Sequence, residues 1–167
     1  MTRTPIATGA VWNAETVGVP DAWTYELDDR ARGAIVEAAC AMRDAGVTPE
    51  TANHSPVNLD ALAPLTARWI EELRNGRGFV LVRNFPVDLL DETTTELAYL
   101  AFGLQFGQPV SQDASGTLLG HVRDLRVPRT SPAIRRYATN ERQDFHTDGA
   151  DIIGLLCLQG ARRGGES

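Results

Sequence analysis

Apolar residues recur every three or four positions in three stretches of the chain, and this spacing predicts three helices. The first spans about 28–46, and the second begins at about Leu59 or Pro64 and ends at Asn75. Proline fits only the first turn of a helix, so the second helix can begin later than its apolar pattern does. The third follows Asp91, a residue type that caps helix N-termini. The positions expected to face the core are Ala31, Ile35, Ala38 or Ala39, Met42, Leu62, Leu65, Trp69, Leu73, Leu97, Leu100 and Leu104.

Three other stretches are typical of strands. Gly78–Phe85 (GFVLVRNF) is rich in β-branched and aromatic residues and lies between a glycine and Pro86. Residues 108–142 contain short strand candidates between turn residues, Leu118–Val122 among them. Ile152–Leu158 (IIGLLCL) is long enough for a buried strand and too short for a typical helix. Helices first and then short strands predict a mainly β fold with flanking helices.

The composition changes this picture little. The 167 residues suffice for one domain, which we divide into a lead-in with a helix at 1–57 and the main part at 58–167. The net charge of −6 argues against nucleic acid as a partner, because phosphate binding needs clustered cations. Cys40 and Cys157 are expected to be small buried residues in a reducing, cytoplasmic environment. No apolar run approaches membrane-spanning length, so no membrane partner is expected.

The segment Gln143–Asp151 (QDFHTDGAD) holds the most informative chemistry. Residues two apart on an extended chain point to the same side, so His146 and Asp148 can direct an imidazole and a carboxylate at one point. Two such ligands and a distant second histidine form the facial triad of non-haem Fe(II) oxygenases, which leaves positions open for a co-substrate and dioxygen. Asp144 shares that side and is a rival ligand. The pair by itself is also compatible with an ordinary polar turn.

The surrounding motifs resemble the taurine dioxygenase-like (TauD/TfdA) family of Fe(II)- and 2-oxoglutarate-dependent oxygenases. The motifs that carry the resemblance are Gly78–Phe85, Leu100–Pro109 (LAFGLQFGQP), Phe145–Asp148 (FHTD), Ile152–Leu158 and Gly164–Ser167 (GGES). The resemblance implies a double-stranded β-helix (a jelly roll of the clavaminate synthase type). It also implies oxidation of a small-molecule substrate by O2, with 2-oxoglutarate converted to succinate and CO2.

The resemblance also assigns roles to individual residues. It implies that His146 and Asp148 bind Fe(II), and that the Ser167 hydroxyl binds a 2-oxoglutarate carboxylate. Gln112 lies near a family position that contacts the primary substrate, and Asn140 and Arg142 belong to a segment that lines the same pocket. Surface-loop roles for these last three residues stay open. The second iron-binding histidine and an arginine that pairs with 2-oxoglutarate come after the Gly-Gly-acid-Ser segment in this family.

Neither His54 nor His121 corresponds to the missing histidine ligand, and His121 is expected to be a structural histidine at a strand edge. We therefore expect the chain to be the N-terminal part of a longer protein, inactive by itself and with the β-helix incomplete. Two alternatives stay open: a non-catalytic member that kept the fold as a binding module, and a cupin-type metalloenzyme that does not use 2-oxoglutarate. The substrate is not identified by the sequence, and homo-oligomers are neither predicted nor excluded.

Overall fold

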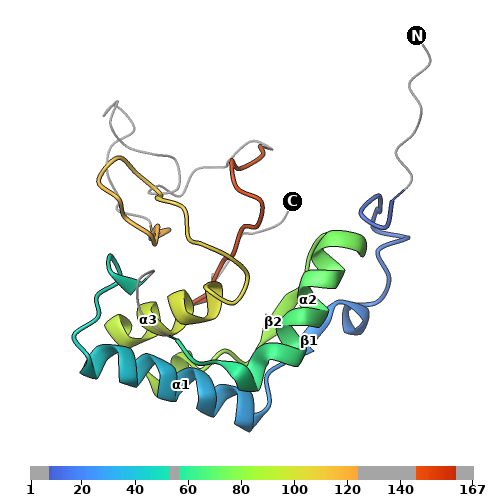
Figure 1. Cartoon of the computed structure of the whole chain (residues 1–167). Coiled ribbons are helices and arrows are strands. Elements are labelled where there is room, and N and C mark those ends of the chain that lie inside the picture. The colour runs from blue at the N-terminus through green and yellow to red at the C-terminus, as the bar shows by residue number, and fades with distance from the viewer. Residues whose placement is uncertain (1–7, 53–56, 124–145, 161–167) are drawn as a thin grey trace.

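Three α-helices and two short strands make up the regular structure of the described residues, which in this computed structural model are 8–52, 57–123 and 146–160 (Figure 1). The helices are α1 (Asp29–Asp44), α2 (Ala63–Asn75) and α3 (Glu92–Gly103), and the strands are β1 (Thr24–Glu26) and β2 (Leu81–Arg83). Short 3-10 turns lie at η1 (Pro20–Ala22), η3 (Asp60–Leu62) and η4 (Val87–Leu89). No helix in these ranges is both long and apolar enough to cross a membrane.

Helix α1 begins and ends where the sequence predicts. The Asp28 side chain accepts a hydrogen bond from the Ala31 N–H (2.8 Å), which satisfies a backbone donor of the first turn. After the helix, Gly46 adopts a left-handed φ of 73°, a conformation that glycine adopts at little cost. The buried face of α1 consists of Ala31, Ile35, Ala39 and Met42, and this face packs against α3. The predicted periodicity is thereby confirmed.

Helix α2 shows the predicted late start. Pro64 occupies its first turn, and the 3-10 turn η3 precedes it. Trp69, with no exposed surface, is its main contribution to the core. The Trp69 ring lies 6.0 Å from that of Tyr25 in β1, 5.8 Å from Phe102 in α3 and 6.3 Å from Phe106, measured between centroids. One tryptophan thus connects α2 to β1, to α3 and to the turn that follows α3.

The strands form a parallel pair in which Thr24 lies opposite Leu81 and Glu26 opposite Arg83. The predicted strand Gly78–Phe85 is thus regular over three residues only. It ends at Asn84, whose left-handed φ of 65° turns the chain and whose Nδ2 donates to the Leu27 carbonyl (2.9 Å). Arg32 fixes this corner from α1, because its guanidinium donates to the Asn84 carbonyl (2.7 Å) and pairs with Asp88 (2.8 Å).

Helix α3 is the central element of the core. Asp91 caps it as predicted, accepting from the Thr94 N–H (2.8 Å). The hydrogen bond from the Thr94 N–H keeps the pKa of Asp91 below its ordinary value. Helix α3 is buried on two sides because it lies between α1 and the aromatic cluster around Trp69. The buried residues of α3 are Thr94, Thr95, Leu97, Ala98, Leu100 and Ala101.

The predicted later strands are not found in the described residues. Leu118–Val122 has no regular structure, and Ile152–Leu158 is an irregular segment with Leu155 at 85% exposure, so the prediction of a buried strand there is wrong. A strand needs a neighbour for its backbone hydrogen bonds, and no described residue pairs with this segment.

Cys157 is exposed and Cys40 half-buried, which corrects the expectation that both are buried. The regular structure of the described part is mostly helical, and the mainly β fold is not confirmed by it.

Candidate functional site

His146 and Asp148 lie side by side at the start of the last described segment. The His146 Nε2 is 3.7 Å from the Asp148 Oδ1, and the two side chains are 55% and 53% exposed. Neither residue belongs to a helix or strand. The prediction that residues two apart direct these groups to one side is therefore consistent with the geometry, although the backbone there is irregular.

This donor pair fits a divalent metal ion in type and in separation. An imidazole nitrogen and a carboxylate oxygen are ligands that non-haem iron sites use. Two neighbouring ligands at about 2.1 Å from an octahedral ion lie about 3 Å apart. The observed distance of 3.7 Å is slightly larger than this, and a rotation of one side chain can close the difference. Both side chains are more than half exposed. The pair can thus supply two ligands, and a three-ligand site needs one more.

Gln112, a predicted substrate contact, lies in a tight turn after α3. Its backbone N–H donates to the Thr117 carbonyl (2.7 Å), and its Nε2 donates to the Val110 carbonyl (2.9 Å). The Asp113 carboxylate organises the turn by accepting from the Ser115 hydroxyl (2.6 Å) and the Thr117 N–H (3.2 Å). These hydrogen bonds hold the pKa of Asp113 far below its ordinary value. The turn is thus held together by its own side chains.

The remaining predicted residues lie outside the described part of the chain. They are Asn140 and Arg142, predicted to face the substrate, and Ser167, predicted to bind 2-oxoglutarate. His54 is also outside it. Their roles stay predictions.

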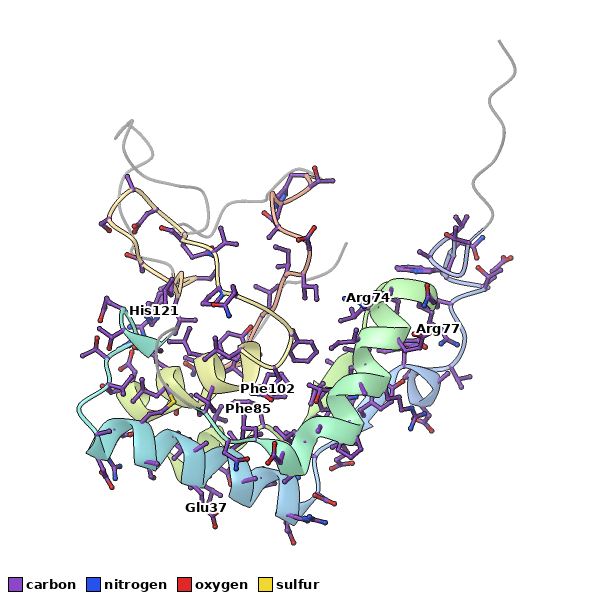
Figure 2. All side chains as sticks on the ribbon, viewed as in Figure 1. Glu37, Arg74, Arg77, Phe85, Phe102 and His121 are labelled. Carbon is purple, nitrogen blue, oxygen red and sulfur yellow. The ribbon has the colours of Figure 1, made fainter. Side chains whose placement is uncertain are left out.

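A second group of possible ligands was not recognised in the sequence. Glu92, Glu96 and His121 place one ligand atom each within 4.8 Å of one another. His121 is labelled in Figure 2. The His121 Nε2 lies 3.1 Å from Glu96, and Arg123 pairs with Glu92 and approaches the His121 Nδ1 (3.4 Å). Arginine can only donate, so the His121 Nδ1 accepts and its Nε2–H faces Glu96.

The position of Arg123 decides what this second group does. Its guanidinium already compensates Glu92 and lowers the pKa of that carboxyl. The group is therefore a chain of polar contacts, with one ion pair between Arg123 and Glu92, that fastens the segment after Leu119 to α3. A metal ion would have to displace Arg123. The prediction that His121 lies at a strand edge is wrong, because it lies on no strand. The only signal in the sequence was the four-residue spacing of two glutamates on a predicted helix, which does not specify a distant partner.

The described surface also has a shallow cavity of about 300 Å³ between the N-terminal segment and the C-terminal end of α2. The Arg77 side chain crosses it, donating to the Val17 carbonyl (3.0 Å) and pairing with Glu72 (2.9 Å). Trp12 donates from Nε1 to the Arg77 carbonyl (2.9 Å). These contacts fasten the N-terminal segment to α2, which is a structural role. The lining residues are Thr8, Gly9, Val11, Trp12, Thr16, Glu72, Gly76 and Arg77.

Comparison with known proteins identifies the class. The sequence model of the taurine catabolism dioxygenase TauD, TfdA family matches residues 43–167, three quarters of the chain, so the chain belongs to this family. Dioxygenases of the family use Fe(II) and 2-oxoglutarate. The chain is also 33% identical over 165 residues to the FR-33289 synthase of Streptomyces rubellomurinus (strain ATCC 31215), covering 98% of this chain and 49% of that protein. It thus spans about half the length of the curated relative that it matches.

Proposed function

We propose that the chain belongs to an Fe(II)- and 2-oxoglutarate-dependent dioxygenase that hydroxylates a small molecule in the cytoplasm and releases succinate and CO2. The observation that carries the proposal is the 3.7 Å approach of the His146 imidazole to the Asp148 carboxylate. This pair lies inside the range that matches the dioxygenase family. A family match without a plausible ligand pair, or a ligand pair without the family, would support much less.

In the proposed site, His146 and Asp148 bind the iron. When bound, the ion and 2-oxoglutarate supply the activation of dioxygen that oxidises a C–H bond. The contribution of this chain is to hold the neutral imidazole and the charged carboxylate toward the same point, so that a single negative charge offsets part of the charge of the ion. We propose that the Ser167 hydroxyl binds a carboxylate of 2-oxoglutarate and that Gln112, Asn140 and Arg142 contact the substrate. We also propose that residues 58–167 belong to the jelly-roll domain.

The matched relative is a synthase, and this name is compatible with an oxidation that builds a small molecule. The substrate class proposed here is accordingly a small organic molecule. No nucleic acid or membrane is part of the proposal. The net charge of −6 supports the first exclusion, because phosphate backbones repel an acidic surface.

The proposal is tested with the complete gene product by succinate formation from 2-oxoglutarate in the presence of Fe(II), ascorbate and air. We expect turnover that requires both iron and 2-oxoglutarate. His146→Ala is expected to abolish it, whereas His121→Ala, which removes a histidine from the chain of polar contacts on α3, is expected to retain it. Iron-dependent oxidation without 2-oxoglutarate would instead favour a cupin-type enzyme. A protein that binds no iron and forms no succinate would favour a non-catalytic binding module.

A further inference from the structure

The segment that carries His146 and Asp148 makes one unusually close approach to the helical core. At Gly154, a Cβ atom would lie 2.6 Å from the Tyr99 hydroxyl oxygen and 3.6 Å from the Tyr99 Cζ. The first distance is shorter than any normal contact between these atom types. A side chain at position 154 would therefore force either the Tyr99 hydroxyl or the segment itself to shift. Figure 1 shows the 146–160 segment, in red, descending to the C-terminal half of α3 at this point.

Tyr99 is itself held in place. It belongs to α3, whose neighbouring residues Ala98 and Leu100 are buried in the core. Its ring meets that of Phe85 edge to face, with centroids 6.2 Å apart and planes at 85°. Burial raises the pKa of the Tyr99 phenol, so the hydroxyl is neutral in the ordinary pH range. The hydroxyl oxygen is thus a rigid point on an anchored helix.

The apolar side chains next to Gly154 are only partly covered. Around Gly154, the side chains of Ile152, Ile153 and Leu155 are exposed by 41%, 51% and 85%, whereas Leu156 is half-buried. The close approach to Tyr99 lies six residues after Asp148 and places this part of the segment against α3.

We propose that Tyr99 is a positioning residue for the metal-binding pair: its hydroxyl supports Gly154 and thereby sets where the chain carrying His146 and Asp148 leaves the core. This inference rests on the proposed function, because it assumes that His146 and Asp148 bind the metal. Tyr99 does not touch the metal or the substrate in this proposal. It acts through the backbone of the segment that bears the ligands, as supporting residues around metal sites do.

The test changes Gly154 and Tyr99, singly and together, in the complete gene product. The dissociation constant for cobalt(II) is measured by the visible absorption of the bound ion. Gly154→Ala adds a methyl group against the hydroxyl and is expected to weaken cobalt binding about tenfold, in the range found for residues that support metal ligands. Tyr99→Phe removes the oxygen and is expected to weaken binding by a smaller factor. In the double variant, the methyl group takes the space of the lost oxygen, with Cζ at an ordinary 3.6 Å, and affinity is expected to recover.

The matched control is Gly160→Ala, on the same segment, where an added Cβ meets nothing within 4 Å. It is expected to bind cobalt like the wild type. Thermal unfolding of each variant is recorded in parallel, and affinity is measured well below the lowest midpoint. A purely structural contact would shift the midpoints and leave cobalt affinity unchanged. If Gly154→Ala does not fold, Tyr99→Phe decides alone: wild-type affinity in that variant overturns the inference.

Two kinds of failure can be told apart. If His146→Ala binds cobalt as tightly as the wild type, the proposed metal pair is wrong, whatever the Gly154 variants do. If His146→Ala loses cobalt but Gly154→Ala binds like the wild type, or the double variant shows no recovery, the metal pair stands and the role of Tyr99 is overturned.

Discussion

The helical part of the chain, from Thr24 to Phe106, differs sharply from the segment at 146–160 that carries the candidate ligands. In the first, the helices satisfy their own backbone hydrogen bonds and bury a shared core around Trp69. In the second, the described residues form no helix or strand, and apolar side chains such as Leu155 face outward. The part of the molecule with a packed core thus differs from the part that carries the candidate ligands. Functional residues are commonly placed on irregular segments that a rigid scaffold holds.

The contrast also shows what each region needs from the rest of the protein. A helix completes its hydrogen bonds within ten or so residues of sequence, whereas an extended apolar segment completes its own only beside another strand. Ile152–Leu158 has the composition of a buried strand and lacks such a neighbour among the described residues. The close approach of Gly154 to Tyr99 is one described connection between the two regions.

The largest expected effect is on the helical core. Trp69→Ala should lower the free energy of unfolding by about 3–5 kcal/mol, because it leaves a cavity where three aromatic rings meet. Trp69→Phe is the control: it keeps an aromatic ring and removes an indole N–H that is buried without a hydrogen-bond partner, so its cost should be smaller. Denaturant unfolding followed by circular dichroism measures both. Equal costs for the two variants would show that the aromatic contacts do not dominate the core.

The ion pair that fastens the N-terminal segment gives a smaller, pH-dependent effect. Hydrogen bonds from the Arg77 backbone N–H and from its guanidinium lower the pKa of Glu72 below the ordinary 4.5. A lowered folded-state pKa contributes stability that is present above the ordinary pKa and is lost as the pH falls through the folded-state value. Glu72→Gln should therefore be less stable than the wild type at pH 7, and the difference should shrink below pH 4.5.

Unfolding midpoints of both proteins between pH 7 and pH 3 provide the measurement. Glu71→Gln, next in sequence and bonded to the Asn75 side chain instead of to Arg77, is the matched control. It should show a much weaker pH dependence. A wild-type advantage over Glu72→Gln that persists unchanged at pH 3 would contradict the assigned role of the Arg77–Glu72 pair.

The smallest effect is expected in the ligand-bearing segment. Leu155→Ser changes a side chain that is 85% exposed, so its effect on the unfolding free energy should stay within about 0.5 kcal/mol. The buried Leu97→Ala in α3 should cost about 2–5 kcal/mol under the same conditions. Comparable losses from both variants would mean that Leu155 is covered in solution and that the two regions are less distinct than described.

The elements that the sequence predicted well are those with local signals. Asp28 and Asp91 as caps and Gly46 as a stop act within a few residues, so the bounds of α1 and the start of α3 followed from them. The predicted ligand pair also rests on a local signal, since His146 and Asp148 are two residues apart, and its role stays a prediction. The chain of polar contacts from Glu96 through His121 and Arg123 to Glu92 joins residues up to 31 apart, and no local pattern specifies such a pairing.

The prediction of a buried strand at 152–158 was wrong for a related reason: it depended on residues far away in the sequence. The apolar run at 152–158 correctly suggested strand-like composition, but burial depends on partners that composition does not reveal. The contact between Tyr99 and Gly154 escaped prediction as well, because one glycine in an apolar run has many possible explanations.

The most direct test of the central claim is an anaerobic Fe(II) titration of the complete gene product and of three single variants. We predict that the wild type binds one iron, that His146→Ala and Asp148→Ala each weaken binding at least about tenfold, and that His121→Ala binds like the wild type. If His121→Ala loses iron while His146→Ala and Asp148→Ala retain it, the metal belongs to the Glu92, Glu96 and His121 group and the account is contradicted.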